Sequence, residues 1–86
     1  MEHLSVVMYG AQWCGDCRRS KALLDRLQAP YTYVDLEQDP DGARQAEQIS
    51  GRQSIPVIAF ADGQFLVEPS DAELTDALTV RNLISS

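Results

Sequence analysis

Short apolar runs alternate with a helical stripe along the first part of the chain. Residues 4–9 are apolar and partly β-branched and stop at Gly10, a pattern typical of a buried central strand. From Cys14 to Gln28 leucines recur at helical spacing among charged residues, and Pro30 prevents the helix from continuing. Residues 31–36 are rich in β-formers and predict a second strand. A strand, a helix and a strand in this order predict a βαβ unit with parallel strands.

A second helix and a hairpin are expected next. Residues 39–41, Asp-Pro-Asp, start a thin apolar stripe that ends at Gly51, which predicts a short helix between them. Residues 55–60 predict a strand that tolerates a proline only near its start. Residues 61–63, Ala-Asp-Gly, supply the turn, and residues 64–67 form the antiparallel partner.

The chain is expected to end in a capped helix. Ser70 is a good N-cap, and Glu73 three residues later completes a capping box. The apolar stripe that follows reaches Leu83 or Ile84, so this helix can pack on the sheet. The predicted order is βαβαββα, in a single domain that covers residues 1–86.

Composition and charge narrow the function classes. The chain has 86 residues, of which 44% are hydrophobic and 23% charged, and its net charge is −6. Residues 10–30 carry four basic against two acidic residues, whereas residues 31–86 carry three against ten. An acidic chain argues against a nucleic-acid partner, which requires a basic face. The basic zone suits an anionic thiol or a protein disulfide, or is simply a solvated helix face.

The sequence offers no targeting or membrane-spanning segment. The apolar run at residues 4–8 has no basic segment before it and is far too short for a signal sequence or a transmembrane helix. We therefore expect a cytoplasmic protein with no membrane partner. In that compartment a C-x-x-C spacing indicates a redox or metal motif rather than a structural disulfide.

Both cysteines lie in one motif, Trp13-Cys14-Gly15-Asp16-Cys17, where the first helix begins. A cysteine at a helix start is exposed to the positive end of the helix dipole and to unpaired N–H groups, and both favour the thiolate. Cys17 follows one turn later, close enough to form a disulfide with Cys14. Dithiol redox chemistry requires this arrangement of an acidified attacking sulfur and a second sulfur that displaces what the first one captures.

Other interpretations of the sulfur pair are open. Zinc usually takes four Cys or His ligands, and the chain offers only Cys14, Cys17 and His3. A metal or iron–sulfur cluster bridging two subunits would avoid this shortage. Two unreactive buried cysteines are disfavoured, because Trp13 and Gly15 place the pair on an exposed turn.

Beyond the motif, the chain closely resembles the glutaredoxins, and within them the mycoredoxin branch, which serves small thiols other than glutathione. The resemblance implies a thioredoxin-like α/β fold, with a four-stranded mixed sheet flanked by three helices. It covers nearly the whole chain. The matching residues are Met8 to Cys17, Ser54-Ile55-Pro56-Val57, Phe60-Ala61-Asp62-Gly63, and Pro69-Ser70 with Asp71 and Glu73.

The resemblance implies roles for individual residues. Cys14 matches the family's nucleophile and Cys17 its resolving thiol. Pro56 matches the family's cis-proline, whose preceding residue offers its backbone to an extended substrate; the alternative is a trans proline in an edge strand. The Ser70-Asp71 turn matches the site for a thiol's carboxylate, unless it is only a helix cap. The substrate-binding residues that we expect are Gln12, Trp13, Ile55, Pro56, Ser70 and Asp71.

Two departures from the family bear on the choice of small thiol. Glu68-Pro69 stands where glutathione-using members commonly carry Gly-Gly, and residues 10–12 lack the lysine common before the first cysteine. Both changes favour mycothiol, bacillithiol or a reduced protein donor over glutathione. Trp13 could stack on a sugar-containing thiol or simply shield the sulfur. Arg44 and Arg52 are candidate anion anchors or ordinary surface charges.

We therefore expect a thiol–disulfide oxidoreductase that acts as a monomer, without a bound cofactor. Its co-substrate would be a low-molecular-weight thiol (mycothiol, bacillithiol or glutathione), its clients disulfide-bearing proteins, and its upstream partner a flavoprotein reductase. The alternatives are a dithiol electron donor to an enzyme such as ribonucleotide reductase, and a non-catalytic metal or iron–sulfur carrier. Asp16 is expected to tune the couple toward reduction, because a carboxylate between the two sulfurs disfavours the thiolate, unless it points into solvent or only caps the helix.

Overall fold

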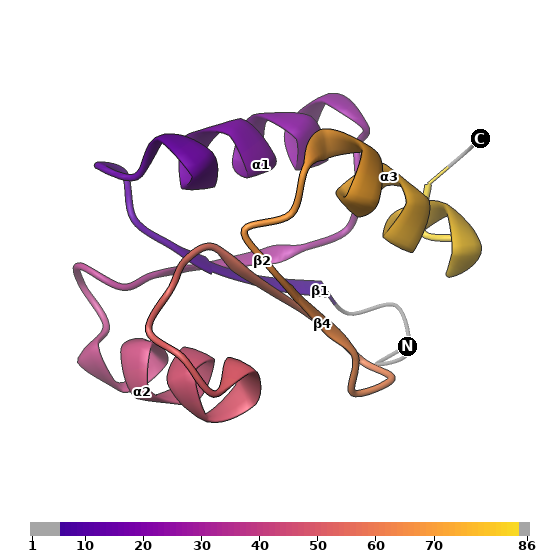
Figure 1. Ribbon diagram of the computed structural model, residues 1–86. Coiled ribbons are helices and arrows are strands. Elements are labelled where there is room, and N and C mark those ends of the chain that lie inside the picture. Colours follow the sequence, from indigo (N-terminus) through magenta and orange to yellow (C-terminus); the bar gives the residue numbers. More distant parts are fainter. Residues whose placement is uncertain (1–5, 85–86) are drawn as a thin grey trace.

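A four-stranded mixed sheet lies between two layers of helices (Figure 1). The computed structural model describes residues 6–84, so the expected strand start at Leu4 and the candidate ligand His3 lie outside the described residues. The order βαβαββα is confirmed. Along the chain the elements are β1 (Val6–Gly10), α1 (Gly15–Arg26), β2 (Thr32–Asp35), α2 (Pro40–Ser50), β3 (Val57–Phe60), β4 (Phe65–Val67) and α3 (Asp71–Val80).

The strands are arranged in the order β2-β1-β3-β4. β1 and β2 are parallel, with Tyr9 beside Val34, as the βαβ unit predicts. β3 runs antiparallel to β1 and to β4, so the expected hairpin is confirmed. The carboxyl end of β1 therefore leads directly into the Cys14 turn and α1, which places that turn at one edge of the sheet.

Both faces of the sheet are buried. Helices α1 and α3 cover one face and α2 covers the other (Figure 1). Successive side chains of a strand point to opposite faces, so Met8 packs under α1 and α3 whereas Tyr9 packs against α2. The larger core is formed by Val6, Met8, Cys17, Leu23, Leu24, Ile58, Phe60, Leu74, Leu78 and Leu83.

The helix ends follow the predicted signals. The Asp39 side chain accepts a hydrogen bond from the Gly42 N–H at 3.1 Å, and Gly51 ends α2 in the left-handed conformation with φ 77°. Ser70 and Glu73 form both hydrogen bonds of the capping box, at 3.1 and 2.8 Å. The turn before α3 is therefore fixed by its own side chains.

Two predicted boundaries are wrong. β3 begins at Val57, so Ile55 and Pro56 precede the strand, because proline has no N–H to donate to a neighbouring strand. The last helix ends at Val80 and does not reach Leu83, because Asn82 adopts a left-handed backbone with φ 57°. Leu83 still reaches the core from beyond the helix.

Candidate active site

The Cys14 sulfur lies at the N-terminus of α1, where the sequence predicts it. Cys14 is the N-cap residue, and its Sγ accepts a hydrogen bond from the Cys17 N–H at 3.2 Å. The side chain is half-buried, and Sγ lies 3.9 Å from the carbonyl oxygen of Ile55. An N–H donor and the positive end of the helix dipole both stabilise negative charge on this sulfur.

The Cys17 sulfur lies one turn further and inside the core. Cys17 is 1% exposed, and a Cβ built on Gly10 would come within 3.1 Å of its Sγ, so the absence of a side chain at Gly10 makes room for the sulfur. Burial, followed by the contact with Cys14, raises the pKa of Cys17 to about 12. Both cysteines are free thiols, and Cys14 is the one that reaches the surface.

A surface groove of about 510 Å³ opens around Cys14, which is within the usual range for a small-molecule site. Trp13 forms one wall and is 68% exposed. Of the expected substrate-binding residues, Trp13 and Ile55 line this groove. The full lining is Trp13, Cys14, Gly15, Asp16, Gln53, Ser54, Ile55 and Glu68.

The other four expected substrate-binding residues, Gln12, Pro56, Ser70 and Asp71, are not part of the groove lining. The Gln12 carbonyl accepts a hydrogen bond from Arg18 at 2.6 Å, and the Ile55–Pro56 bond is cis, as the resemblance implies. Ser70 and Asp71 stand at the start of α3, where Ser70 is engaged in the capping box. A substrate-binding role stays a prediction for all six of the expected residues.

The two candidate anion anchors differ in their surroundings. Arg44 and Arg52 both line a second cavity, which shares residues 53–55 with the Cys14 groove. Arg44 forms an ion pair with Asp41 on its own helix. The Arg52 side chain forms no ion pair with any of residues 6–84, so it is the freer of the two to meet an anion.

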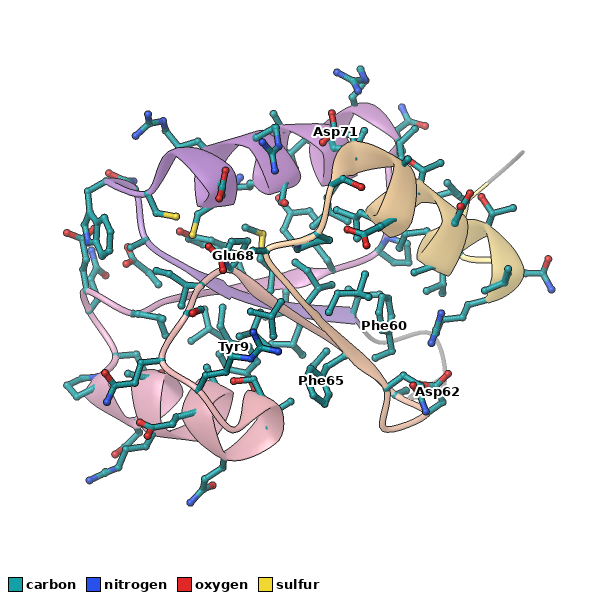
Figure 2. The ribbon with its side chains drawn as sticks, viewed as in Figure 1. Tyr9, Phe60, Asp62, Phe65, Glu68 and Asp71 are labelled. Carbon is teal, nitrogen blue, oxygen red and sulfur yellow. The ribbon has the colours of Figure 1, made fainter. Side chains whose placement is uncertain are left out.

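Sequence reasoning missed the role of Arg19. Its guanidinium lies 3.3 Å from the Asp16 carboxylate and 3.6 Å from that of Asp71, and it donates to the Pro69 carbonyl at 3.3 Å. Arg19 thus connects the first turn of α1 to the start of α3, where Figure 2 shows Asp71. The i, i+3 spacing of Asp16 and Arg19 could have indicated the first of these pairs.

The basic zone predicted near the cysteines does not form a basic groove. Among the described residues, the groove lining contains the carboxylates of Asp16 and Glu68 and neither a lysine nor an arginine. Arg19 is engaged by two carboxylates, and Lys21 lies 3.2 Å from Asp25. Helical spacing places charges around a helix, but the neighbouring elements decide which of them face the site.

Asp16→Asn is expected to favour the Cys14 thiolate. Removing the carboxylate removes an anion beside the sulfur, so the reduced form is stabilised and the reduction potential rises. The rise should be on the order of 10 mV, the scale of an exposed charge pair, because Arg19 already offsets part of the charge. Thiolate absorbance at neutral pH and the potential of the Cys14–Cys17 couple measure both effects. The surface variant Asp76→Asn is the control, and an Asp16→Asn protein with unchanged absorbance and potential would show that Asp16 has no tuning role.

No metal or membrane site is evident in the described part of the chain. Within residues 6–84 no group of three or more His, Cys, Asp or Glu side chains is placed to hold a metal ion. None of the helices in this range is both long and apolar enough to cross a bilayer.

A family model and a relative of known sequence both match this chain, and they point to the same family. The family model described as Glutaredoxin matches residues 6–66. A Mycobacterium tuberculosis protein named as a glutaredoxin is 32% identical over 71 residues, which cover 81% of this chain and 84% of that protein.

Solved structures support the same relationship. Glutaredoxin Grx-1 from Archaeoglobus fulgidus superposes with a TM-score of 0.74 at 22% identity, covering 83% of this chain and 82% of that one. The buckwheat glutaredoxin–glutathione complex gives a TM-score of 0.68 at 27% identity, covering 93% and 81%. These structures confirm the thioredoxin-like α/β fold that the sequence predicts.

Proposed function

This chain belongs to the glutaredoxin family and is a thiol–disulfide oxidoreductase, and we propose that it removes low-molecular-weight thiols from proteins through Cys14. The observation that carries the proposal is the position of the Cys14 sulfur and its contacts. It combines access to the groove with an N–H donor at 3.2 Å and a helix N-terminus. A thiolate is the attacking species in disulfide exchange, and this position is the one that stabilises it.

In the first step the Cys14 thiolate attacks the small-thiol sulfur of a protein mixed disulfide. A disulfide forms between Cys14 and the small thiol, and the protein leaves as a thiolate that takes up a proton. In the second step the thiolate of another small-thiol molecule attacks this adduct. That step releases the disulfide of the small thiol and restores the Cys14 thiolate, so one free small-thiol molecule is consumed for each client cysteine restored.

Cys17 provides a second route, which its position favours. Its sulfur is one helical turn from Cys14 and buried beneath it. After losing its proton, it would attack Cys14 and release the captured thiol, leaving a Cys14–Cys17 disulfide. This route would serve intramolecular protein disulfides and would need an external reductant such as a flavoprotein reductase.

The small thiol is proposed to be mycothiol or bacillithiol rather than glutathione. Within the described residues the Cys14 groove offers no lysine or arginine to the two carboxylates of glutathione. Bacillithiol also carries two carboxylates, on its malate group, whereas mycothiol carries none, so the charge of the groove favours mycothiol. The Ser70 N–H is taken by Glu73, and Asp71 is paired with Arg19. Trp13, largely exposed at the groove wall, offers an aromatic face to a sugar-containing thiol.

A panel of thiols tests this proposal. One protein mixed disulfide is prepared with each of mycothiol, bacillithiol and glutathione, and turnover is measured with the matching free thiol. We expect mycothiol to give a kcat/KM at least about tenfold above that of glutathione, which corresponds to 1.4 kcal/mol of transition-state binding, with bacillithiol between the two. Equal or faster turnover with glutathione would contradict the choice of thiol while leaving the reaction type intact.

A further inference from the structure

Glu68 stands on the loop between β4 and α3 and lines the groove of Cys14. In Figure 2 it lies below α1. Its N–H donates to the carbonyl of Pro56 at 2.9 Å, which holds the backbone next to the site. The residue that follows, Pro69, is fully buried. The loop is therefore anchored on both sides of an exposed glutamate side chain.

The backbone of Glu68 is in an unfavourable conformation. Its φ is 50°, in the left-handed region that residues with a Cβ rarely adopt outside Asn, Asp and Gly. Glycine would adopt this conformation without the steric cost. Within residues 6–84 the carboxylate forms neither an ion pair nor a hydrogen bond that would offset that cost. Stability alone therefore gives no reason for glutamate at this position.

Two other carboxylates on α1 and α3 share one cation. Asp16 and Asp71 share the guanidinium of Arg19, at 3.3 and 3.6 Å. Glu68 has no such partner among the described residues, so it adds a full negative charge to the groove that an incoming thiol meets.

We propose that Glu68 is a specificity-determining residue that selects the small thiol by charge, disfavouring anionic thiols and favouring neutral or cationic ones. The inference rests on the proposed function, because it concerns the thiol that attacks the Cys14 adduct. In that step a thiolate approaches a disulfide in the groove, and any further negative charge on it is repelled by the carboxylate. The repulsion between partly exposed charges changes rates by roughly two- to fivefold.

Three small thiols of different charge test this role. The full chain carrying Cys17→Ser is loaded with a mixed disulfide at Cys14, and release of the adduct is followed with cysteamine, mercaptoethanol and mercaptoethanesulfonate. Each rate is divided by the rate of the same thiol with a small-molecule disulfide, which removes differences in intrinsic nucleophilicity. The normalised rates should fall from the cationic to the neutral to the anionic thiol, and the spread should shrink at high salt.

Variants at Glu68 separate charge from backbone. Glu68→Gln should bring the three normalised rates within about twofold of one another, and Glu68→Gly should do the same while raising the midpoint of urea unfolding. Asp76→Asn removes the same charge from the outer surface of α3 and should leave the order of the thiols unchanged. Equal normalised rates for the three thiols in the protein with Glu68 intact, or the same spread of rates after Glu68→Gln, would overturn this inference and leave the proposed function standing. If none of the thiols released the adduct, the proposed function would fail and this inference with it.

Discussion

Cys14→Ser will reduce the rate of every disulfide reduction by this protein to that of the uncatalysed reaction. A serine hydroxyl is not ionised at neutral pH, so the group at the N-terminus of α1 would no longer be a nucleophile. The hydrogen bond from the Cys17 N–H and the helix dipole would remain, but they would have no thiolate to stabilise. The measurement is turnover of a mixed disulfide and of an intramolecular protein disulfide by the same variant.

The fold should survive this substitution. Cys14 is half-buried at a helix cap, and serine is itself a favoured N-cap residue. We therefore expect the free energy of unfolding to change by no more than about 0.5 kcal/mol. Residual turnover of either substrate by a folded Cys14→Ser protein would contradict the assignment of Cys14 as the nucleophile.

Cys17→Ser will separate the two routes. The variant should retain de-thiolation of a mixed disulfide within about a factor of three, because that reaction needs only Cys14 and an external thiol. It should lose reduction of intramolecular protein disulfides, because the mixed disulfide with the client could no longer be resolved. Since Cys17 is buried, a hydroxyl there can also destabilise the fold by about 1–3 kcal/mol, so Cys17→Ala is the companion variant. An equal loss of both activities in folded Cys17→Ala would exclude a route that uses Cys14 alone.

The pH dependence should differ between the routes. Burial keeps Cys17 protonated at neutral pH, with a pKa of about 12, so only a small fraction is the attacking thiolate. Where resolution limits the rate, reduction of intramolecular disulfides should rise about tenfold for each pH unit below that value. De-thiolation by Cys17→Ser should instead level off above about pH 8.5, where an ordinary external thiol is already ionised.

Features set by local signals could be predicted from the sequence. Gly10 ends the strand before the first helix, and Pro30 prevents that helix from continuing. The position of Cys14 at the helix start therefore follows from nearby residues. The capping box of Ser70 and Glu73 is likewise contained within four residues. The boundary of β3 was wrong because residues 55–60 form one continuous apolar run, in which nothing but the proline marks where pairing begins.

Features that depend on distant parts of the chain could not be predicted. The pair between Arg19 and Asp71 joins α1 to α3, and only the packed fold brings these two residues together. The left-handed backbone of Glu68 has no signal in its residue type, since glutamate rarely adopts it. The sequence marked Glu68-Pro69 as a departure from relatives, but the structure places the carboxylate in the groove of Cys14.

The central claim, that Cys14 carries the small thiol during the reaction, is tested most directly by identifying the covalent intermediate. Cys17→Ser protein is mixed with a protein mixed disulfide, quenched with acid, and analysed by mass spectrometry after proteolysis. We predict one adduct of the mass of the small thiol on the peptide containing Cys14, together with stoichiometric release of the free client thiol. Client thiol released without an adduct on Cys14, or a Cys14 peptide disulfide-linked to a client peptide instead of the small thiol, would contradict the account.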